Sequence, residues 1–153
     1  MSVQIQNNTS LLYPKFYEKL SKGVEKARAS GLDIHIFETF RSAERQEHLY
    51  VQKPQVTWTR GWMSWHQYGL AADLVFGGPG KWTWNGDYDK VRDFMLGEGL
   101  RGLGEKDRGH FEYQHPLSIF EAKQIALKNG QIAVWLAIEN LLKAGKKGNE
   151  TLN

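Results

Sequence analysis

The chain has 153 residues, a length that gives one domain a substantial hydrophobic core and leaves little room for a second. It contains no cysteine, which excludes disulfides and thiolate metal sites, so any zinc must bind through nitrogen and oxygen ligands. The formal net charge is +3 with dispersed lysines and arginines, which does not indicate a nucleic-acid-binding protein.

The two ends of the chain show no membrane signal. The first 15 residues lack the basic start and apolar stretch of a signal peptide. The longest apolar run, residues 132–138, is too short to span a bilayer. We therefore expect a protein made in the cytoplasm without stable membrane insertion, and a single domain over residues 1–153 that is a monomer by default.

The N-terminal part of the chain predicts a helix followed by a strand. Pro14 suits a first helical turn, and Gly31 ends the helical pattern. Between them, apolar residues recur at the spacing of an amphipathic helix: Phe16, Leu20, Val24 and Ala27. Residues 33–39 are β-prone and lie between a glycine and a polar cluster, which indicates a strand.

Residues 42–67 predict a short helix and then a long irregular loop. Ser42 can cap a helix running to about residue 51, so Arg41 would lie at a strand-to-helix junction. Residues 52–67 follow neither period, and loops of that length are often functional. Six tryptophans are unusual in so short a chain, and five of them lie near the predicted site, as core or as a wall facing sugar or peptide: Trp58, Trp62, Trp65, Trp82 and Trp84.

The second half of the chain predicts a sheet built from three further strands, near residues 70–76, 100–103 and 109–113. A glycine-rich turn at residues 77–80 indicates a hairpin onto residues 81–84. Asp87 can cap a helix that ends near Gly97 or Gly99.

Two helices are expected to close the chain. Ser118 and Glu121 fit a capping box, and Asn129-Gly130 ends that helix. A second helix, over about residues 132–143, has a broad apolar face that also includes Glu139 and favours core packing: Ile132, Trp135, Leu136, Ile138 and Leu142. We therefore expect a catalytic core over about residues 13–115, with helices over about residues 117–144 packed on it.

Two imidazoles and a carboxylate, His66, Asp73 and His110, predict a mononuclear metal site. Three such ligands leave a fourth zinc position open for water, which distinguishes a catalytic site from a structural one. Asp73 lies in an otherwise apolar strand, where its charge needs a cation, and an arginine partner is the alternative to a metal. The remaining histidines lack such surroundings and are predicted to be non-ligands: His35, His48 and His115.

Asp107, three residues before His110, is the candidate general base for a water molecule made acidic by the metal. Glu105 is the competing candidate, and a solvated loop charge is the alternative role for either residue. The chain has no HExxH motif, which excludes the arrangement of the common zinc proteases.

The spacing of these residues resembles a known family. Ser64, His66, Gly69, Ala71 and Asp73 form the pattern S-x-H-x-x-G-x-A-x-D, followed by an acidic residue three before a histidine. This pattern is similar to that of the VanX/VanY-type zinc peptidoglycan peptidases, which include D-alanyl-D-alanine peptidases and phage L-alanyl-D-glutamate endolysins. Residues 39–50 also resemble the family's Y-R-S-x-x-x-Q-x-x-L-Y stretch, so the likeness covers about residues 35–113.

The resemblance implies a small α+β fold of the hedgehog-like DD-peptidase type, an antiparallel sheet with flanking helices. It implies one zinc ion per chain, bound by the three residues His66, Asp73 and His110. It also implies that Asp107 is the general base and that Arg41 stabilises the developing oxyanion. The substrate-binding residues would be Ser64, Gln46 and Trp65.

The implied activity is hydrolysis of the stem peptide of bacterial peptidoglycan. Aspartate as the acidic residue favours a bacteriolytic L-alanyl-D-glutamate endopeptidase of phage or prophage origin, an antimicrobial endolysin acting on the cell wall after release. The alternatives are a D-alanyl-D-alanine carboxypeptidase and a non-catalytic zinc-containing binding module. Residues 100–106 lack the family's usual tryptophans, and Gly109 replaces its usual proline. These departures concern the substrate-side wall and leave the metal ligands intact.

Overall fold

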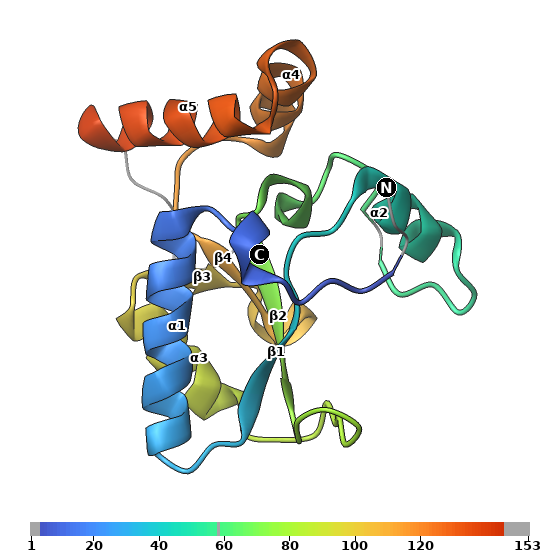
Figure 1. Ribbon diagram of the computed structural model, residues 1–153, viewed down its shortest axis with the longest axis vertical. Coiled ribbons are helices and arrows are strands. Elements are labelled where there is room, and N and C mark those ends of the chain that lie inside the picture. The colour runs from blue at the N-terminus through green and yellow to red at the C-terminus, as the bar shows by residue number, and fades with distance from the viewer. Residues whose placement is uncertain (1–3, 58, 146–153) are drawn as a thin grey trace.

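Four antiparallel strands form the central sheet of the computed structural model, which describes residues 4–57 and 59–145. Their spatial order is β1-β2-β4-β3. The bounds are Ile34–Glu38 for β1, Ala71–Phe76 for β2, Leu100–Gly102 for β3 and His110–Tyr113 for β4. With helices around this sheet, the predicted α+β architecture is confirmed (Figure 1).

The register of the sheet aligns polar residues that are far apart in the sequence. Asp73 on β2 pairs with His110 on β4 on one side and with Glu38 on β1 on the other. The ladder between β1 and β2 is irregular at Ile36 and Glu38, as in a β-bulge. Three polar side chains therefore start from one row across three strands.

Two helices, α1 (Pro14–Ala29) and α3 (Tyr88–Gly97), lie side by side along the sheet (Figure 1). Phe16 and Leu20 of α1 are fully buried, as the helical pattern predicts. Gly23 of α1 packs against Met95 of α3, and a Cβ at position 23 would lie 2.9 Å from Met95 Sδ and force that side chain to move. The predicted cap of α3 is also confirmed, since the Asp87 side chain accepts from the backbone N–H of Lys90.

Helix α2 (Ala43–Val51) begins where the sequence predicts, because the Ser42 side chain accepts from the backbone N–H of Arg45. The loop after α2 includes Trp58, which lies outside the described residues. The expectation that this loop continues through residue 67 is wrong. Its end forms a 3-10 turn, η2 (Trp65–Tyr68), because Ser64 and Gln67 cap each other's backbone in a capping box.

The predicted hairpin after β2 is present only as one bridge. Phe76 and Thr83 exchange both backbone hydrogen bonds, at 3.1 and 2.9 Å, and no ladder continues beyond them in the described structure. Beyond this bridge the same edge of β2 is already paired, because the backbone N–H of Leu74 donates to the Gly109 carbonyl at 2.8 Å. Two more short 3-10 turns, η1 (Thr9–Leu11) and η3 (Gly104–Lys106), were not predicted because their few residues show no periodicity.

The C-terminal helices α4 (Ile119–Asn129) and α5 (Gln131–Lys143) lie beyond one end of the sheet (Figure 1). The predicted capping box of Ser118 and Glu121 is confirmed. Core packing is confirmed for one side of α5, where Val134 and Ile138 are buried, whereas its other side is exposed, with Ile132 at 65% and Leu136 at 56%. The division into a core and two packed helices stays a prediction.

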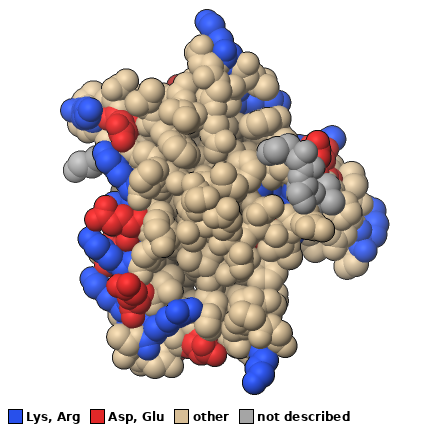
Figure 2. Space-filling model, viewed as in Figure 1, with Lys and Arg blue, Asp and Glu red and all other residues tan. Residues whose placement is uncertain are grey.

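The described surface has no single-sign charge patch on the face that Figure 2 shows. Lysines and arginines alternate there with acidic residues along the edge over α1, and the centre is mostly uncharged (Figure 2). Among the described helices, none is long and apolar enough to cross a membrane.

Candidate metal centre

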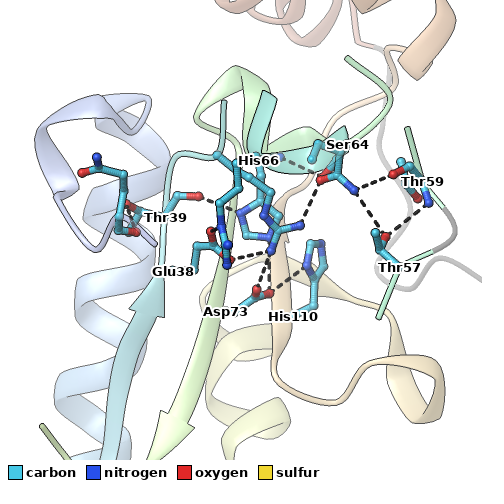
Figure 3. Close-up of polar contacts among 12 residues, drawn as sticks. Glu38, Thr39, Thr57, Thr59, Ser64, His66, Asp73 and His110 are labelled. Carbon is cyan, nitrogen blue, oxygen red and sulfur yellow. Dashed lines mark hydrogen bonds and ion pairs between the residues drawn. The ribbon is translucent and has the colours of Figure 1, made fainter. Parts of the chain in front are cut away.

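His66, Asp73 and His110 converge from η2, β2 and β4 (Figure 3). Each offers one ligand atom, and these atoms all lie within 4.8 Å of one another. In the described part of the chain, the group that could hold a metal ion contains these three residues and none of the predicted non-ligands: His35, His48 and His115. The structure therefore brings together the ligand set that the sequence predicts.

The backbone orients His66 so that one ring nitrogen is left free. Its Nδ1–H donates to the carbonyl oxygen of Thr39 at 2.7 Å, so the lone pair is on Nε2. Nε2 lies 3.3 Å from Asp73 Oδ1 but has no hydrogen-bond partner among the described residues, although the side chain is only 1% exposed. A buried polar atom without a partner is costly unless it binds something else. Two imidazole nitrogens and a carboxylate therefore fit a zinc ion.

Two carboxylates hold the imidazole of His110, one at each ring nitrogen. His110 donates from Nδ1 to Asp73 Oδ1 at 3.0 Å and from Nε2 to Glu112 Oε1 at 2.8 Å. Glu112 in turn accepts from Arg101 Nε at 3.0 Å. A carboxylate that accepts from the non-ligating nitrogen of a metal-binding histidine fixes the tautomer of that histidine and raises its basicity. His110 would therefore bind a metal through Nδ1.

The protonation of His110 follows from these contacts. Burial alone would lower its pKa, but the Asp73 and Glu112 carboxylates raise the pKa of His110 to about 10. Burial opposes the charge of Asp73 as well, yet the nearby His66 and His110 hold the pKa of Asp73 well below its usual range. In the metal-free protein His110 is thus an imidazolium between two carboxylates, and a metal on Nδ1 replaces a proton.

Metal binding should therefore release about one proton from His110, and apparent affinity should rise about tenfold per pH unit up to about pH 10. Titration calorimetry at pH 8 in buffers of different ionisation enthalpy measures that proton. Conversely, this imidazolium stabilises the metal-free protein fully below about pH 6.5, and that contribution is lost as pH rises through about 10. Metal binding without proton release would contradict the assignment of His110 as an imidazolium in the metal-free protein.

Replacing Glu112 with glutamine should weaken zinc binding by about 10–100-fold, the usual cost of losing an outer-shell partner. The neutral amide cannot hold the His110 N–H as strongly as the carboxylate does. Competition with a chromophoric chelator measures the change. Glu121→Gln, in the exposed cap of α4, is the matched control, and equal affinities in the two variants would rule out the role of Glu112.

Arg41 binds the third ligand. Its Nη2 donates to Asp73 Oδ2 at 3.1 Å and to Glu38 Oε1 at 2.8 Å, and Arg45 holds the other Glu38 oxygen at 2.7 Å. Burial opposes ionisation of Glu38, but the two guanidinium groups lower its pKa. Of the two partners predicted for Asp73, a metal or an arginine, the structure shows the arginine, and the ligand group leaves the metal open to test. Arg41 lies on the cleft wall beside the ligands.

The predicted substrate-binding residues differ in position. Gln46 is fully buried, accepts from Arg41 Nη1 at 3.0 Å and donates to the Thr59 carbonyl at 2.6 Å, so it positions Arg41 and does not line the cleft. Ser64 lines the cleft and its Oγ accepts from the backbone N–H of His66 at 3.3 Å. Trp65 also lines the cleft. Its ring packs edge-on against His115 at 4.3 Å between centroids.

Asp107 and Glu105, the two candidate bases, are separated by the structure. Asp107 lines a cleft of about 860 Å³ together with the three ligands, whereas Glu105 does not line it. The Glu105 side chain is 87% exposed and lies 3.9 Å from Arg108. Desolvation at the cleft wall and the Asp73 charge raise the pKa of Asp107, as suits a proton acceptor. The geometry therefore favours Asp107.

Sequence reasoning missed the residues that support the ligands: Glu38, Thr39, Arg101 and Glu112. A signal was available for two of them. Glu38 and Glu112 are acidic residues in apolar strands, the same feature that identified Asp73. The carbonyl of Thr39 carries no such signal, because any residue there has a carbonyl.

The comparisons with known proteins bear on the family and the fold of this chain. No family model matches the chain. Peptidoglycan L-alanyl-D-glutamate endopeptidase CwlK of Bacillus subtilis (strain 168) is 39% identical over 69 residues, a match that covers 41% of this chain and 41% of CwlK. The match thus spans less than half the length of that relative.

Two solved structures share the fold. L-Ala D-Glu endopeptidase ChiX of Serratia marcescens has a TM-score of 0.55 at 22% identity, over 69% of this chain and 83% of ChiX. L,D-carboxypeptidase DacB from Streptococcus pneumoniae has a TM-score of 0.54 at 22% identity, over 92% of this chain and 80% of DacB. The matched segment and the shared fold together confirm the resemblance of this chain to the VanX/VanY-type peptidoglycan peptidases.

Proposed function

We propose that the protein is a zinc-dependent peptidoglycan hydrolase that cleaves the L-alanyl-D-glutamate bond of the stem peptide. The observation that carries this proposal is the convergence of His66, Asp73 and His110 with Asp107 in one cleft. The likeness to CwlK, an L-alanyl-D-glutamate endopeptidase, supports the choice of bond.

The residues of the cleft have distinct tasks in this reaction. His66, Asp73 and His110 would hold one zinc ion per chain, which would supply Lewis acidity for a carbonyl and for water. Asp107 accepts the proton of the attacking water and passes it to the leaving amine. Arg41 lies beside Asp73, where a guanidinium can stabilise the negative oxygen of the tetrahedral state.

Aromatic side chains provide a wall for the substrate. Phe37 and Trp84 line the cleft with ring centroids 5.0 Å apart, and Trp84 is 55% exposed. The neighbouring Trp82 is also exposed, so the exposure of Trp82 and Trp84 favours a wall over core packing, whereas Trp65 is buried in the core. Such a surface suits the aliphatic parts of a peptide and the faces of sugar rings. Ser64 and Trp65 complete the lining beside the ligands.

We also propose a biological setting for this activity. Aspartate at position 107 favours the phage or prophage endolysins over the D-alanyl-D-alanine dipeptidases. The protein would then be a monomer, made in the cytoplasm, that acts on bacterial peptidoglycan after release and lyses the cell.

Two alternatives remain distinct from this proposal. A carboxypeptidase removing terminal D-alanine would use the same metal centre, and the fold is also that of L,D-carboxypeptidase DacB. A non-catalytic module would keep zinc only to stabilise the fold. The presence of Arg41 and Asp107 in the cleft argues against that module, because a structural zinc needs neither an oxyanion partner nor a proton acceptor.

Mass spectrometry of digested peptidoglycan separates the three functions. Purified walls are treated with the zinc-loaded protein and, as a control, with the chelated protein. Stem peptides that begin at D-glutamate, with L-alanine left on muramic acid, are the expected products. Loss of terminal D-alanine alone would assign a carboxypeptidase, and no metal-dependent product from several wall types would overturn the enzyme proposal.

A further inference from the structure

The turn that carries His66 is anchored by its own carbonyl groups, and helix α5 supplies one of the donors. Trp135 of α5 donates from its indole N–H to the carbonyl of Tyr68 at 2.6 Å. The backbone N–H of Tyr13 donates to the next carbonyl, that of Gly69, at 2.9 Å. Two elements far from η2 in the sequence thus hold its C-terminal end.

A second pair of contacts holds the other side of the same turn. The backbone N–H of Arg41 donates to the His66 carbonyl at 3.1 Å, and the His66 ring donates to the Thr39 carbonyl at 2.7 Å. The direction of the free His66 Nε2 therefore depends on how η2 is positioned between residues 39–41 and α5.

The C-terminal end of η2 is closely packed against its neighbours. Gly69 has φ +68, and a Cβ there would lie 2.5 Å from the Leu11 carbonyl oxygen and 3.3 Å from Trp135 Cζ2. Trp135 is itself packed on Tyr13, with ring centroids 5.1 Å apart, and the Tyr13 hydroxyl donates to Glu139 one turn further along α5. Close-packed contacts of this kind transmit displacement directly, because the neighbouring atoms cannot yield.

We propose that Trp135 is a positioning residue of the metal centre, which acts through Tyr68 on the orientation of His66. Helix α5 is then part of the support of the metal site. This inference rests on the metal centre of the proposed function, so its test begins with metal binding by the unaltered protein.

The test compares Co²⁺ binding by the wild type, Trp135→Phe and Trp82→Phe, followed by visible absorption. Trp135→Phe keeps an aromatic ring and removes the N–H. We expect its Co²⁺ affinity to fall by about tenfold, the lower end of the cost of losing an outer-shell partner, with an altered absorption band. Trp82→Phe makes the same chemical change on the exposed wall beside Phe37 and should keep the affinity and spectrum of the wild type.

Each outcome bears on a different claim. Absence of Co²⁺ binding by the wild type would overturn the metal centre and this inference with it. Normal binding by the wild type and by Trp135→Phe, with one spectrum, would overturn the role of Trp135 alone. Thermal melting of each metal-free variant shows whether reduced affinity merely reflects unfolding.

A measurement on the wild type covers the case in which Trp135→Phe does not fold. Coupling is reciprocal, so if Trp135 stabilises the metal-binding geometry, the metal must stabilise the contact of Trp135. Hydrogen exchange of the Trp135 indole N–H, followed by NMR, should slow when Zn²⁺ is added. Unchanged exchange at this group, with slower exchange at the η2 amides, would overturn the inference.

Discussion

Replacing His66 with alanine should abolish zinc binding and peptidoglycan hydrolysis together. The variant keeps only Asp73 and His110, and two protein ligands do not make a catalytic zinc site. The loss of affinity should exceed the roughly 10–100-fold cost of losing an outer-shell partner. The Thr39 carbonyl also loses its donor, which should lower the free energy of unfolding of the metal-free protein by about 1–3 kcal/mol.

Elemental analysis of the desalted protein, together with a wall-turbidity assay, measures both losses. His48→Ala is the matched control, because His48 is exposed and lies outside the group that could hold a metal. It should retain both zinc and activity. A His66→Ala protein with one zinc per chain would show that the ligand assignment is wrong.

Most elements of the fold were predictable because their signals are local. The caps at Ser42, Asp87 and Ser118 each receive the predicted backbone hydrogen bond. The turn η2 could have been found in the same way, because Ser64 and Gln67 have the spacing of a capping box. The aromatic residues around η2 show neither helical nor strand periodicity, so the spacing of apolar residues does not reveal this turn.

The metal ligands were predictable from their chemistry and their resemblance, whereas part of the support around them depends on register. His110 and Glu112 lie two residues apart on β4, so the alternation of a strand already places their side chains on one face. Arg101, by contrast, reaches Glu112 only across the β3–β4 pair. Contacts of this kind are set by the sheet as a whole, and a one-residue slip would remove them.

The apolar pattern of α5 does not predict which of its two faces is buried. Its broad apolar stripe predicts burial, yet Ile132 and Leu136 are exposed while Trp135 is half-buried against the core. An apolar pattern identifies a helix but does not state how much of its surface the rest of the chain can cover. The contact that gives α5 its proposed role is a single indole N–H, which no periodicity reveals.

Replacing Asp107 with asparagine should lower kcat by about 10²–10⁴-fold, the usual contribution of a positioned general base. Zinc content should not change, because Asp107 is not in the ligand group. The amide cannot accept a proton, so the acid limb of the pH–rate profile should disappear together with the rate. In the wild type that limb reflects the raised pKa of Asp107, below which the carboxyl group is protonated and cannot act as a base.

Glu105→Gln is the comparison that makes the result specific. It removes an acid two residues away in the same loop, and its side chain lies in solvent outside the cleft. Activity should stay near that of the wild type, with the acid limb intact. If Asp107→Asn kept near-normal kcat while Glu105→Gln lost it, the loop would have to move Glu105 into the cleft during turnover, and the base would be reassigned. If both variants kept their activity, proton transfer would have to pass through another group, and the proposed role of Asp107 would be wrong.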